Sequence, residues 1–475
     1  MTIPLDQLTA NLPTAPRVTA EEVAETACPV LVVLDDDPTG TQSVHDLPVI
    51  TGWTVDDLAW ALGTGARAVY VMTNSRSLAP GDAKRVNEEV VRNGLEAARR
   101  TGAEVAFVSR SDSTLRGHFP LEPDTICDLL AVEGIEVDGI VVVPAFPDAG
   151  RITIDSVHYA GNPATGYVPV GQTEFAADAS FGYRSSNLAE WVEEKSSGRW
   201  KADDVLPITL GTLRGPREDL VAALSSAHDR QPIVVDCLEE NDLRLLALGL
   251  AGAEANGRRY VHRVGPPFVR ARIGQEARAP LTAAECAPQA GATQDTTGAR
   301  GGLVAVGSHV GLTKRQVQTL KDEFGTPELL LDVPTILEPT TRAAEIARVA
   351  AEAAQRLLEG TVIVRAGGEL VVGVDADDSL RIARSVSDAL VETVRTILAT
   401  RPPRFVIAKG GITSSDVASK GLQVRHALVR GPMLPGIVSM WEPVDGPARG
   451  IPYIVFAGNV GDETSLATVV ATLQD

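Results

Sequence analysis

The sequence predicts an α/β protein of two domains, each built on a mainly parallel sheet, with the active-site cleft between them. The chain has 475 residues, which is enough for two or three domains. Short apolar runs rich in β-branched residues alternate with helical patterns, as expected when each strand of a parallel sheet is followed by a helix. This alternation occurs in two series, and a stretch without hydrophobic period separates them.

The first series of predicted strands ends, strand by strand, in polar or glycine-rich sequence. Its apolar runs are CPVLVVL, ARAVYVM, AEVAFV and DGIVVV, followed later by PIVVDC and RYVHRV. Between the second and third runs, DAKRVNEEVVRNGLEAARR has apolar residues at helical spacing, so that Val86, Val90 and Leu95 can share one face. Residues 151–215 are less regular, and we expect them to form an excursion over the cleft.

Residues 274–302 interrupt the alternation and are predicted to be a linker or mobile excursion. They are rich in Ala, Gly, Thr and Pro. The second series follows, with predicted strands in GLVAVGSH, ELLLDV, GTVIVRAGG, RFVIAKGGITSS and PYIVFAGNVGDETS. The predicted organisation is an N-terminal extension (1–29), a first domain (30–273), the linker, and a second domain (303–475).

Composition and charge disfavour several classes of function. A net charge of −19 would repel nucleic acids and anionic membrane surfaces over most of the protein. No run approaches the ~20 apolar residues of a membrane span, and the N-terminus lacks a signal-peptide pattern, so we expect a cytoplasmic protein. The four cysteines form no CxxC pair, which indicates neither a zinc cluster nor a disulfide framework. The sequence does not specify an oligomeric state, although a homodimer is a common default for soluble enzymes.

Three successive predicted strands of the first domain end in charged and hydroxyl side chains. DDDPTG carries three aspartates at 35–37, TNSRSL carries Arg76, and SRSDST carries Arg110 and Asp112. Turn formation at DDDPTG and a solvated Arg76 would explain single motifs. The loops beyond the carboxyl ends of parallel strands converge, however, and form the ligand site of an open sheet. Because arginines bind carboxylates and aspartates bind hydroxyls, the three motifs together predict a site for a sugar acid.

Glycine-rich turns follow three predicted strands of the second domain. GSHVGLTK contains Ser308, AKGGITSSD contains Gly410 and Thr413, and FAGNVG contains Gly458. Each turn alone could be a plain connection between a strand and a helix. Together they predict a nucleotide-phosphate site, since glycines let the backbone approach a ligand and exposed amides bind phosphate. The sequence contains neither GxxxxGK[ST] nor GxGxxG, which disfavours a P-loop enzyme and an ordinary Rossmann dehydrogenase.

The histidines do not indicate a metal or nucleophilic centre. None has the spacing of a metal-ligand motif such as HExxH, and no GxSxG elbow occurs. His118 and His309 lie beside the two polar clusters, where a structural role and contact with a ligand are both open.

Taken in order, these motifs resemble the four-carbon acid sugar kinase family. The likeness extends over about residues 30–470 and includes GRITIDSVHYAGN and FGYRSSNLAEW between the two clusters. It implies an N-terminal domain that binds the acid sugar and a C-terminal domain that binds ATP, with Mg²⁺ accompanying the nucleotide. The implied reaction is phosphorylation of an acid such as threonate, erythronate or 3-oxo-tetronate.

The resemblance also implies roles for individual residues. The family's DDxTG aspartate falls on Asp37, and its K-x-D-S-T segment falls on 110–114, where this chain has arginine in place of lysine. We expect Arg76 and Arg110 to hold the carboxylate, and Asp112 or Asp37 to accept the hydroxyl proton, with Asp112 preferred. The predicted substrate-binding residues are Asp37, Arg76, Arg110, Ser111, Asp112 and Ser113. The predicted nucleotide-binding residues are Ser308, Gly410, Gly411, Ile412, Thr413 and Gly458.

Two other classes of function remain open from the sequence. A NAD-dependent sugar-acid dehydrogenase would also have two α/β domains and a cleft, although no dinucleotide fingerprint occurs. A non-catalytic sugar-acid sensor would bind the acid without needing a phosphate-binding half.

Overall fold

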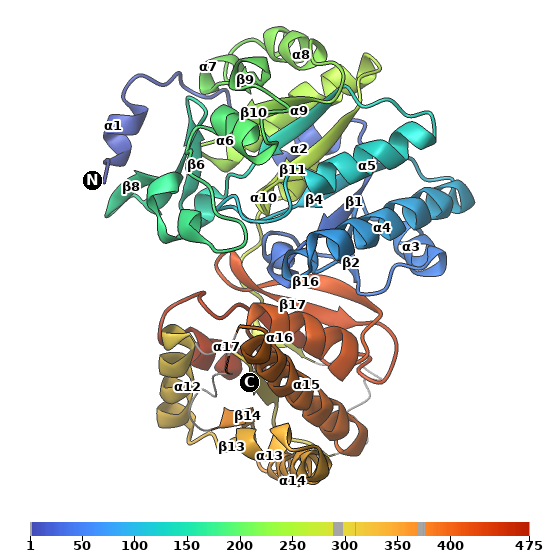
Figure 1. Ribbon diagram of the computed structural model, residues 1–475, viewed down its shortest axis with the longest axis vertical. Coiled ribbons are helices and arrows are strands. Elements are labelled where there is room, and N and C mark those ends of the chain that lie inside the picture. Colours follow the sequence, from blue (N-terminus) through green and yellow to red (C-terminus); the bar gives the residue numbers. More distant parts are fainter. Residues whose placement is uncertain (1, 288–297, 309, 368–373, 375, 475) are drawn as a thin grey trace. The chain divides into compact units, whose positions relative to one another are not determined.

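The computed structural model describes residues 2–287, 298–308, 310–367, 374 and 376–474. The chain divides into two compact units (Figure 1). Unit 1 comprises residues 1–47 and 53–277, and unit 2 comprises residues 48–52 and 278–475. The predicted α/β fold with mainly parallel sheets is confirmed.

Unit 1 contains a parallel sheet with the strand order β3-β1-β4-β11-β5-β10-β9. Val32 of β1, for example, lies between Val69 of β3 and Phe107 of β4. Such strands are buried on both faces, which explains why their sequences are continuous apolar runs. The strands are β1 (Val30–Asp35), β3 (Ala68–Met72), β4 (Val105–Arg110), β5 (Gly139–Val143), β9 (Leu206–Ile208), β10 (Gln231–Val235) and β11 (Tyr260–Val264).

Helices cover both faces of this sheet (Figure 1). On one face α3, α4 and α5 pack side by side, and on the other α2, α8 and α10 pack around α9. Helix α4 has Pro80 at its first position and ends at Gly102, whose φ of 73° suits glycine at a helix end. The helices are α2 (Ala20–Ala24), α3 (Val55–Leu62), α4 (Pro80–Thr101), α5 (Leu121–Val132), α8 (Arg217–Ser225), α9 (Glu240–Ala255) and α10 (Pro267–Arg272).

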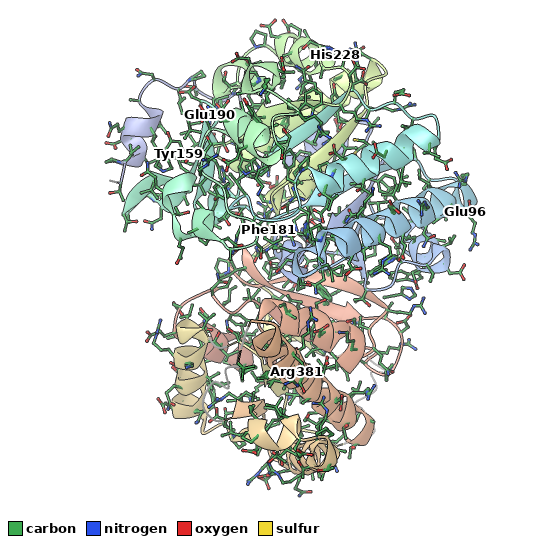
Figure 2. The ribbon with its side chains drawn as sticks, in the orientation of Figure 1. Glu96, Tyr159, Phe181, Glu190, His228 and Arg381 are labelled. Carbon is green, nitrogen blue, oxygen red and sulfur yellow. The ribbon has the colours of Figure 1, made fainter. Side chains whose placement is uncertain are left out.

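The segment expected to be an irregular excursion forms a small antiparallel sheet instead, in the order β6-β7-β8. Figure 2 marks this region by the side chains of Tyr159, Phe181 and Glu190. Residues before β1 also pack on unit 1, where Ile3 pairs with Tyr167. The elements are α1 (Leu5–Thr9), β6 (Arg151–Ile154), β7 (Val157–Asn162), β8 (Gly166–Pro169), α6 (Leu188–Lys195) and α7 (Leu210–Leu213). Short 3₁₀ turns are η1 (Pro38–Ser43), η2 (Ser75–Ser77), η3 (Pro147–Ala149), η4 (Val170–Gln172), η5 (Glu174–Ala177) and η6 (Ala202–Asp204).

Unit 2 contains a sheet with the order β13-β14-β12-β15-β18-β17-β16. The neighbouring strands β13, β14, β12, β15 and β18 are parallel to one another. Strand β17 pairs antiparallel with β18 on one side and with β16 on the other. Residues 48–50 of β2 belong to this unit, and β2 neighbours β16. The strands are β2 (Leu47–Ile50), β12 (Leu303–Val306), β13 (Glu328–Asp332), β14 (Val362–Gly367), β15 (Val406–Lys409), β16 (His426–Leu434), β17 (Ile437–Pro443) and β18 (Tyr453–Phe456).

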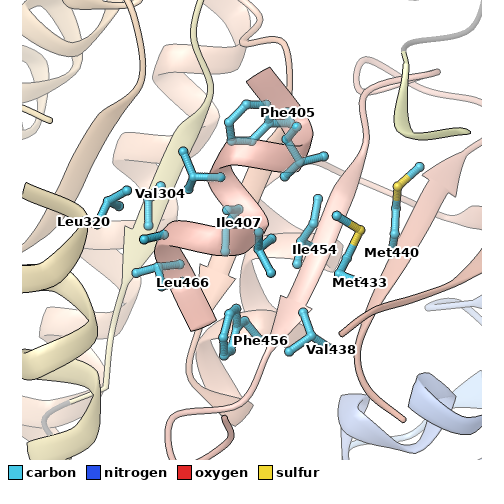
Figure 3. Packing of buried hydrophobic residues seen from close by; sticks show 14 of the residues in the cluster. Val304, Leu320, Phe405, Ile407, Met433, Val438, Met440, Ile454, Phe456 and Leu466 are labelled. Carbon is cyan, nitrogen blue, oxygen red and sulfur yellow. The ribbon is translucent and has the colours of Figure 1, made fainter. Parts of the chain in front are cut away.

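One hydrophobic core of unit 2 lies between this sheet and helices α11, α12 and α17. Val304, Ile407 and Ile454 of the strands pack with Leu320 of α12 and Leu466 of α17 (Figure 3). Within the predicted linker, α11 contributes its cysteine to this core, while residues 288–297 lie outside the described residues. The helices of unit 2 are α11 (Ala283–Cys286), α12 (Gly311–Phe324), α13 (Val333–Leu337), α14 (Pro339–Arg356), α15 (Ala376–Thr400), α16 (Gly411–Asp416), the π-helical turn η8 (Val417–Gly421) and α17 (Ser465–Gln474).

Candidate functional site

The carboxyl ends of β1, β3 and β4 bring the predicted sugar-acid residues together. Asp35, at the end of β1, lies in register with Arg110 at the end of β4. Asp37 then caps η1, because its Oδ1 accepts hydrogen bonds from Thr39 N at 2.9 Å and from Thr39 Oγ1 at 2.6 Å. The turn chemistry and the charge cluster, which were alternatives in the sequence, therefore coexist in the same residues.

The side chain of Arg110 binds the loop formed by Asp35, Asp36 and Asp37, which we call the aspartate loop. Its side chain is 2% exposed, and its guanidinium donates to the carboxylate of Asp35, which is fully buried, and to the Asp37 carbonyl oxygen. Burial raises the pKa of Asp35, while the Arg110 guanidinium opposes that rise. A Cβ at Gly40 would overlap this ion pair, so glycine is required there. Arg110 was expected to bind a substrate carboxylate; in the structure its nitrogens bind Asp35 and the Asp37 carbonyl oxygen, and substrate binding by Arg110 stays an untested prediction.

Arg76 lies at the edge of the same cluster and is less completely engaged. Its Nη2 and Nε donate to the two oxygens of Asp36 at 2.6 and 3.1 Å. Its Nη1 lies 3.6 Å from Asp37 Oδ2, and its side chain is 20% exposed. Asp37 and Asp112, the two predicted proton acceptors, both have a lowered pKa because nearby guanidinium groups, Arg76 foremost, outweigh the effect of burial. Arg76 is therefore partly exposed, and its Nη1 makes no hydrogen bond among the described residues.

Asp112 is an ionised carboxylate with one oxygen available. Its Oδ2 accepts hydrogen bonds from Arg116 Nε at 2.6 Å and from Thr114 Oγ1. Within the described chain, no group donates to its Oδ1. Burial by itself would raise the pKa of Asp112, but Arg76, Arg116 and the two hydrogen bonds lower it to about 2. Asp112 can therefore accept a hydrogen bond from a substrate hydroxyl throughout the physiological pH range.

The two predicted serines beside Asp112 differ in their surroundings. Ser111 Oγ donates to the Arg116 carbonyl oxygen at 3.0 Å, and Ser111 also lines a cavity of about 10 Å³ with Asp112 and Arg263. That volume is close to the minimum that holds a water molecule. Ser113 contributes its carbonyl oxygen, which lies 2.8 Å from His158 Nε2. Ser111 is thus the serine that lies beside the open space near Asp112.

A buried ion pair beneath this site was missed in the sequence. Arg263 Nη1 donates to Ser109 Oγ at 2.8 Å and to Glu122 Oε2 at 2.5 Å, and the other Glu122 oxygen accepts from Ser75 Oγ. Arg263 stands in the run RYVHRV, where the sequence shows only a strand. The sole available signal was a charged residue inside a buried strand, which normally requires a partner.

His118 has a structural role. Its Nε2 lies 3.1 Å from the carbonyl oxygens of Ser75 and Leu78, and its ring packs edge-on against Phe181 with centroids 5.0 Å apart. Phe181 is labelled in Figure 2. The ring nitrogen is therefore occupied by backbone, which disfavours the alternative of ligand contact. His309, the other histidine considered, lies outside the described residues.

In unit 2, the ends of β12, β15 and β18 bring together four of the predicted nucleotide-binding residues. Thr313 Oγ1 donates to the Gly458 carbonyl oxygen at 2.8 Å and lies 3.1 Å from Ser308 Oγ. A Cβ at Gly458 would overlap Ser308 Oγ, and one at Gly410 would lie 3.0 Å from Thr413 Oγ1. Gly410 also has a φ of 133°, a conformation that requires glycine.

We call the turns that carry Ser308, Gly410, Thr413 and Gly458 the glycine cradle. The remaining predicted residues adjoin it. Gly411 begins α16, and Ile412 follows with 57% of its surface exposed. A large exposed apolar side chain beside glycine turns is consistent with contact to a planar ligand such as a base. The glycines are required here because an added side-chain atom would meet the hydroxyl groups of Ser308 and Thr413; binding of a nucleotide phosphate at these turns stays a prediction.

No metal centre is evident in the described part of the chain, where no three His, Cys, Asp or Glu side chains are grouped to hold an ion. Mg²⁺ that enters with ATP is held largely by phosphate oxygens and water, so it does not require such a group. Of the helices that the structure describes, none is long and apolar enough to cross a membrane.

Lys409, directly before the Gly-Gly turn, is a further residue that the sequence did not single out. Its side chain is fully buried at the end of β15. The ammonium donates to the Ala457 carbonyl oxygen at 2.5 Å and lies 3.7 Å from the centre of the Phe456 ring. No carboxylate pairs with it among the described residues, and burial lowers its pKa from 10.5 to about 7. Lys409 thereby ties the end of β15 to the end of β18, beneath the predicted nucleotide turns.

The contribution of Lys409 to the stability of the protein should therefore rise with pH above neutrality. Between about pH 7 and 10 the unfolded chain holds a proton on Lys409 that the folded chain lacks, so the free energy of unfolding increases by up to about 1.4 kcal/mol per pH unit from this group. We expect Lys409→Met to flatten that slope in urea unfolding at pH 7, 8 and 9. Lys420→Met, at an exposed lysine paired with Asp416, is the matched control. Equal slopes in wild type and Lys409→Met would contradict the prediction.

Two domain families match the chain over most of its length. Residues 31–272 match the sugar-binding N-terminal domain, and residues 303–466 match the nucleotide-binding C-terminal domain. The fold and the two sites thus define a protein with one sugar-binding and one nucleotide-binding domain. The chain belongs to the four-carbon acid sugar kinase family, as its motifs predicted.

Individual relatives support this placement. D-erythronate kinase of Heliobacterium modesticaldum is 25% identical over 468 residues, which cover 93% of this chain and 96% of that protein. 3-oxo-isoapionate kinase of Paraburkholderia graminis is 31% identical over 153 residues, or 29% of this chain and 32% of that one. A solved structure from Salmonella typhimurium has a TM-score of 0.67 at 18% identity, over 93% of this chain and 98% of its own. A second, from Haemophilus influenzae, has a TM-score of 0.62 at 17% identity, over 93% and 100%.

Proposed function

We propose that this protein is an ATP-dependent kinase that phosphorylates a hydroxyl group of a four-carbon acid sugar. The observation that carries the proposal is Asp112: an ionised carboxylate with a free oxygen, set among arginines in the domain that matches a sugar-binding family. The glycine cradle of unit 2 supports the nucleotide half of the reaction. The named activity of D-erythronate kinase favours a four-carbon acid as the substrate class, and 3-oxo-isoapionate kinase is likewise named for a sugar acid.

The proposed chemistry is direct in-line transfer without a covalent intermediate. Phosphoryl transfer needs alignment of the hydroxyl with the γ-phosphate and stabilisation of negative charge, more than it needs a strong base. Asp112 Oδ1 would orient the hydroxyl and accept its proton, with Asp37 as the alternative acceptor. Arg76 would bind a substrate oxygen, while Arg110 keeps the aspartates in position.

On the nucleotide side, the proposed ATP site uses backbone and hydroxyl groups rather than a P-loop. Ser308 and Thr413 would donate hydroxyl hydrogen bonds to phosphate oxygens, and the turns at Gly410–Gly411 and Gly458 would let backbone amides approach. Ile412 would cover an apolar part of the nucleotide. Mg²⁺ would arrive with ATP and neutralise phosphate charge.

The test is ADP release by the purified full-length protein with Mg-ATP and a panel of acids. The panel comprises D- and L-threonate, D- and L-erythronate, the 3-oxo-tetronates and longer aldonates. We expect one four-carbon acid to stimulate ADP release well above the rate without acceptor. Acid-dependent reduction of NAD instead would establish the dehydrogenase alternative, and acid binding without turnover of either cofactor would establish the sensor.

A further inference from the structure

Arg151 lies close to the proposed sugar-acid site, and its guanidinium has no carboxylate partner among the described residues. The buried arginines of unit 1 each face a carboxylate: Arg110 pairs with Asp35, Arg214 with Asp242, Arg263 with Glu122, Arg270 with Glu240, and Arg272 with Glu254. Arg151 pairs with none in the described chain. Its Nη1 donates to the Ala149 carbonyl oxygen, whereas its Nε is buried without a hydrogen-bond partner. A half-buried cation with unused donors is costly unless an anion completes it.

The backbone holds Arg151 in one place. It begins β6 directly after Gly150, whose φ is 72° and whose Cβ, if present, would overlap the Gly161 carbonyl oxygen. Arg151 also exchanges two backbone hydrogen bonds with Phe146, at 2.8 and 3.0 Å. The side chain is therefore presented from a rigid strand end, which is the arrangement that a specific binding residue requires.

The guanidinium groups of Arg151 and Arg116 both lie near the aromatic ring of Phe175. Arg151 lies 5.8 Å and Arg116 lies 5.2 Å from the centre of the Phe175 ring. Burial lowers the pKa of Arg151; the nearby Asp112 carboxylate opposes this shift, and the like charge of Arg116 adds to it. Arg116 Nε holds Asp112 Oδ2, while its Nη1 lies 3.9 Å from Asp178. An anionic group bound beside Phe175 would give Arg151 the partner that it lacks, while Arg116 keeps its contact with Asp112.

We infer that Arg151, assisted by Arg116 on the same Phe175 ring, binds the carboxylate of the acid sugar. This assignment rests on the proposed function and replaces the role expected for Arg110. With the carboxylate at Arg151, the hydroxyls of a short acid extend towards Asp112 Oδ1. Arg151 is then the residue that makes the site prefer an acid to a neutral polyol of the same length.

The test compares wild type, Arg151→Met, Arg151→Lys and the control Arg199→Met. Arg199 also lies near an aromatic ring, that of Trp200, but is exposed and paired with Asp124. We expect Arg151→Met to raise the KM for the acid about 10- to 100-fold, the loss typical of hydrogen bonds to a charged group, with kcat and the KM for ATP changed less than about threefold. Arg151→Lys should restore part of the loss, since lysine keeps the charge without the fork.

Two further measurements make the outcome specific. With erythritol as a neutral acceptor, the ratio of kcat/KM for acid over polyol should fall in Arg151→Met by the same factor as acid affinity. Calorimetric titration of erythronate without ATP should show the same weakening, with a melting temperature no lower than that of wild type as evidence of folding. An unchanged acid affinity, or an equal loss for acid and polyol, would overturn the inference. Absence of ADP release with every acid, while Arg151→Met still weakens erythronate binding, would overturn the proposed kinase function but support the inference.

Discussion

Replacing Asp112 with Asn is expected to lower kcat for the acid sugar by about 10²–10⁴-fold, the range for loss of a positioned proton acceptor. Asparagine has the same shape and can still contact Arg116 and Thr114, so the loop should keep its structure. It cannot accept the hydroxyl proton, however. The KM for ATP should change little, because Asp112 belongs to unit 1 and the predicted nucleotide residues to unit 2.

The pH dependence gives an independent check on Asp112. Its pKa of about 2 means that the carboxylate stays ionised as the pH falls from 9 to 5, so Asp112 should contribute no acidic limb to the profile of kcat in this range. Asp128→Asn, at an exposed aspartate paired with Arg230, is the matched control and should leave kcat within about threefold of wild type. An unchanged kcat in Asp112→Asn would remove Asp112 as the acceptor. A larger loss in Asp37→Asn would move the role there.

The fold could be predicted where burial on both sheet faces leaves a strong pattern. The central strands of both units are unbroken apolar runs, and each was expected within a few residues of its position. The antiparallel pair β16 and β17 was missed, because Gly431 and Pro432 interrupt β16 at the irregularity in its pairing. The small sheet β6-β7-β8 was missed because its strands are short and partly exposed, which weakens the apolar signal.

The site could be located from the sequence, but the division of labour among its charges could not. Arg76 and Arg110 both lie at predicted strand ends, so the sequence did not distinguish their roles. The register of β1 against β4 shows that Arg110 faces Asp35. Arg151 and Lys409 stand beside ordinary strand residues, and the absence of a partner carboxylate is visible only in three dimensions. The sequence shows where charged side chains cluster, whereas the fold shows which of them are paired with one another and which are available to a ligand.

Replacing Arg110 with Met is expected to destabilise the protein by about 3–5 kcal/mol, the usual effect of leaving a buried charge without its partner. Asp35 would remain fully buried, and loss of the guanidinium would raise its pKa further. The pKa of Asp35 is already raised to about 8 in the wild type, so below that pH Asp35 gives both proteins the same pH dependence. Above about pH 8 only the wild-type Asp35 ionises in the folded state, and the deficit of the variant should therefore grow from pH 8 upwards. Urea unfolding at several pH values measures this. Asp35→Asn combined with Arg110→Met should recover part of the stability and lose the added pH dependence.

The comparison between Arg110→Met and Arg151→Met distinguishes an arginine that stabilises the fold from one that binds the acid. Arg110 has an internal partner for its charge, so its loss should appear in the free energy of unfolding. Arg151 has none, so its loss should appear in the affinity for the acid, and the stability should be unchanged or increased once an unpaired half-buried cation is removed. Arg199→Met, at an exposed ion pair, should change stability by less than about 1 kcal/mol and serves as control for both. If Arg110→Met instead weakened acid binding without loss of stability, Arg110 would be the carboxylate ligand, and the aspartate loop would have to be held by other contacts.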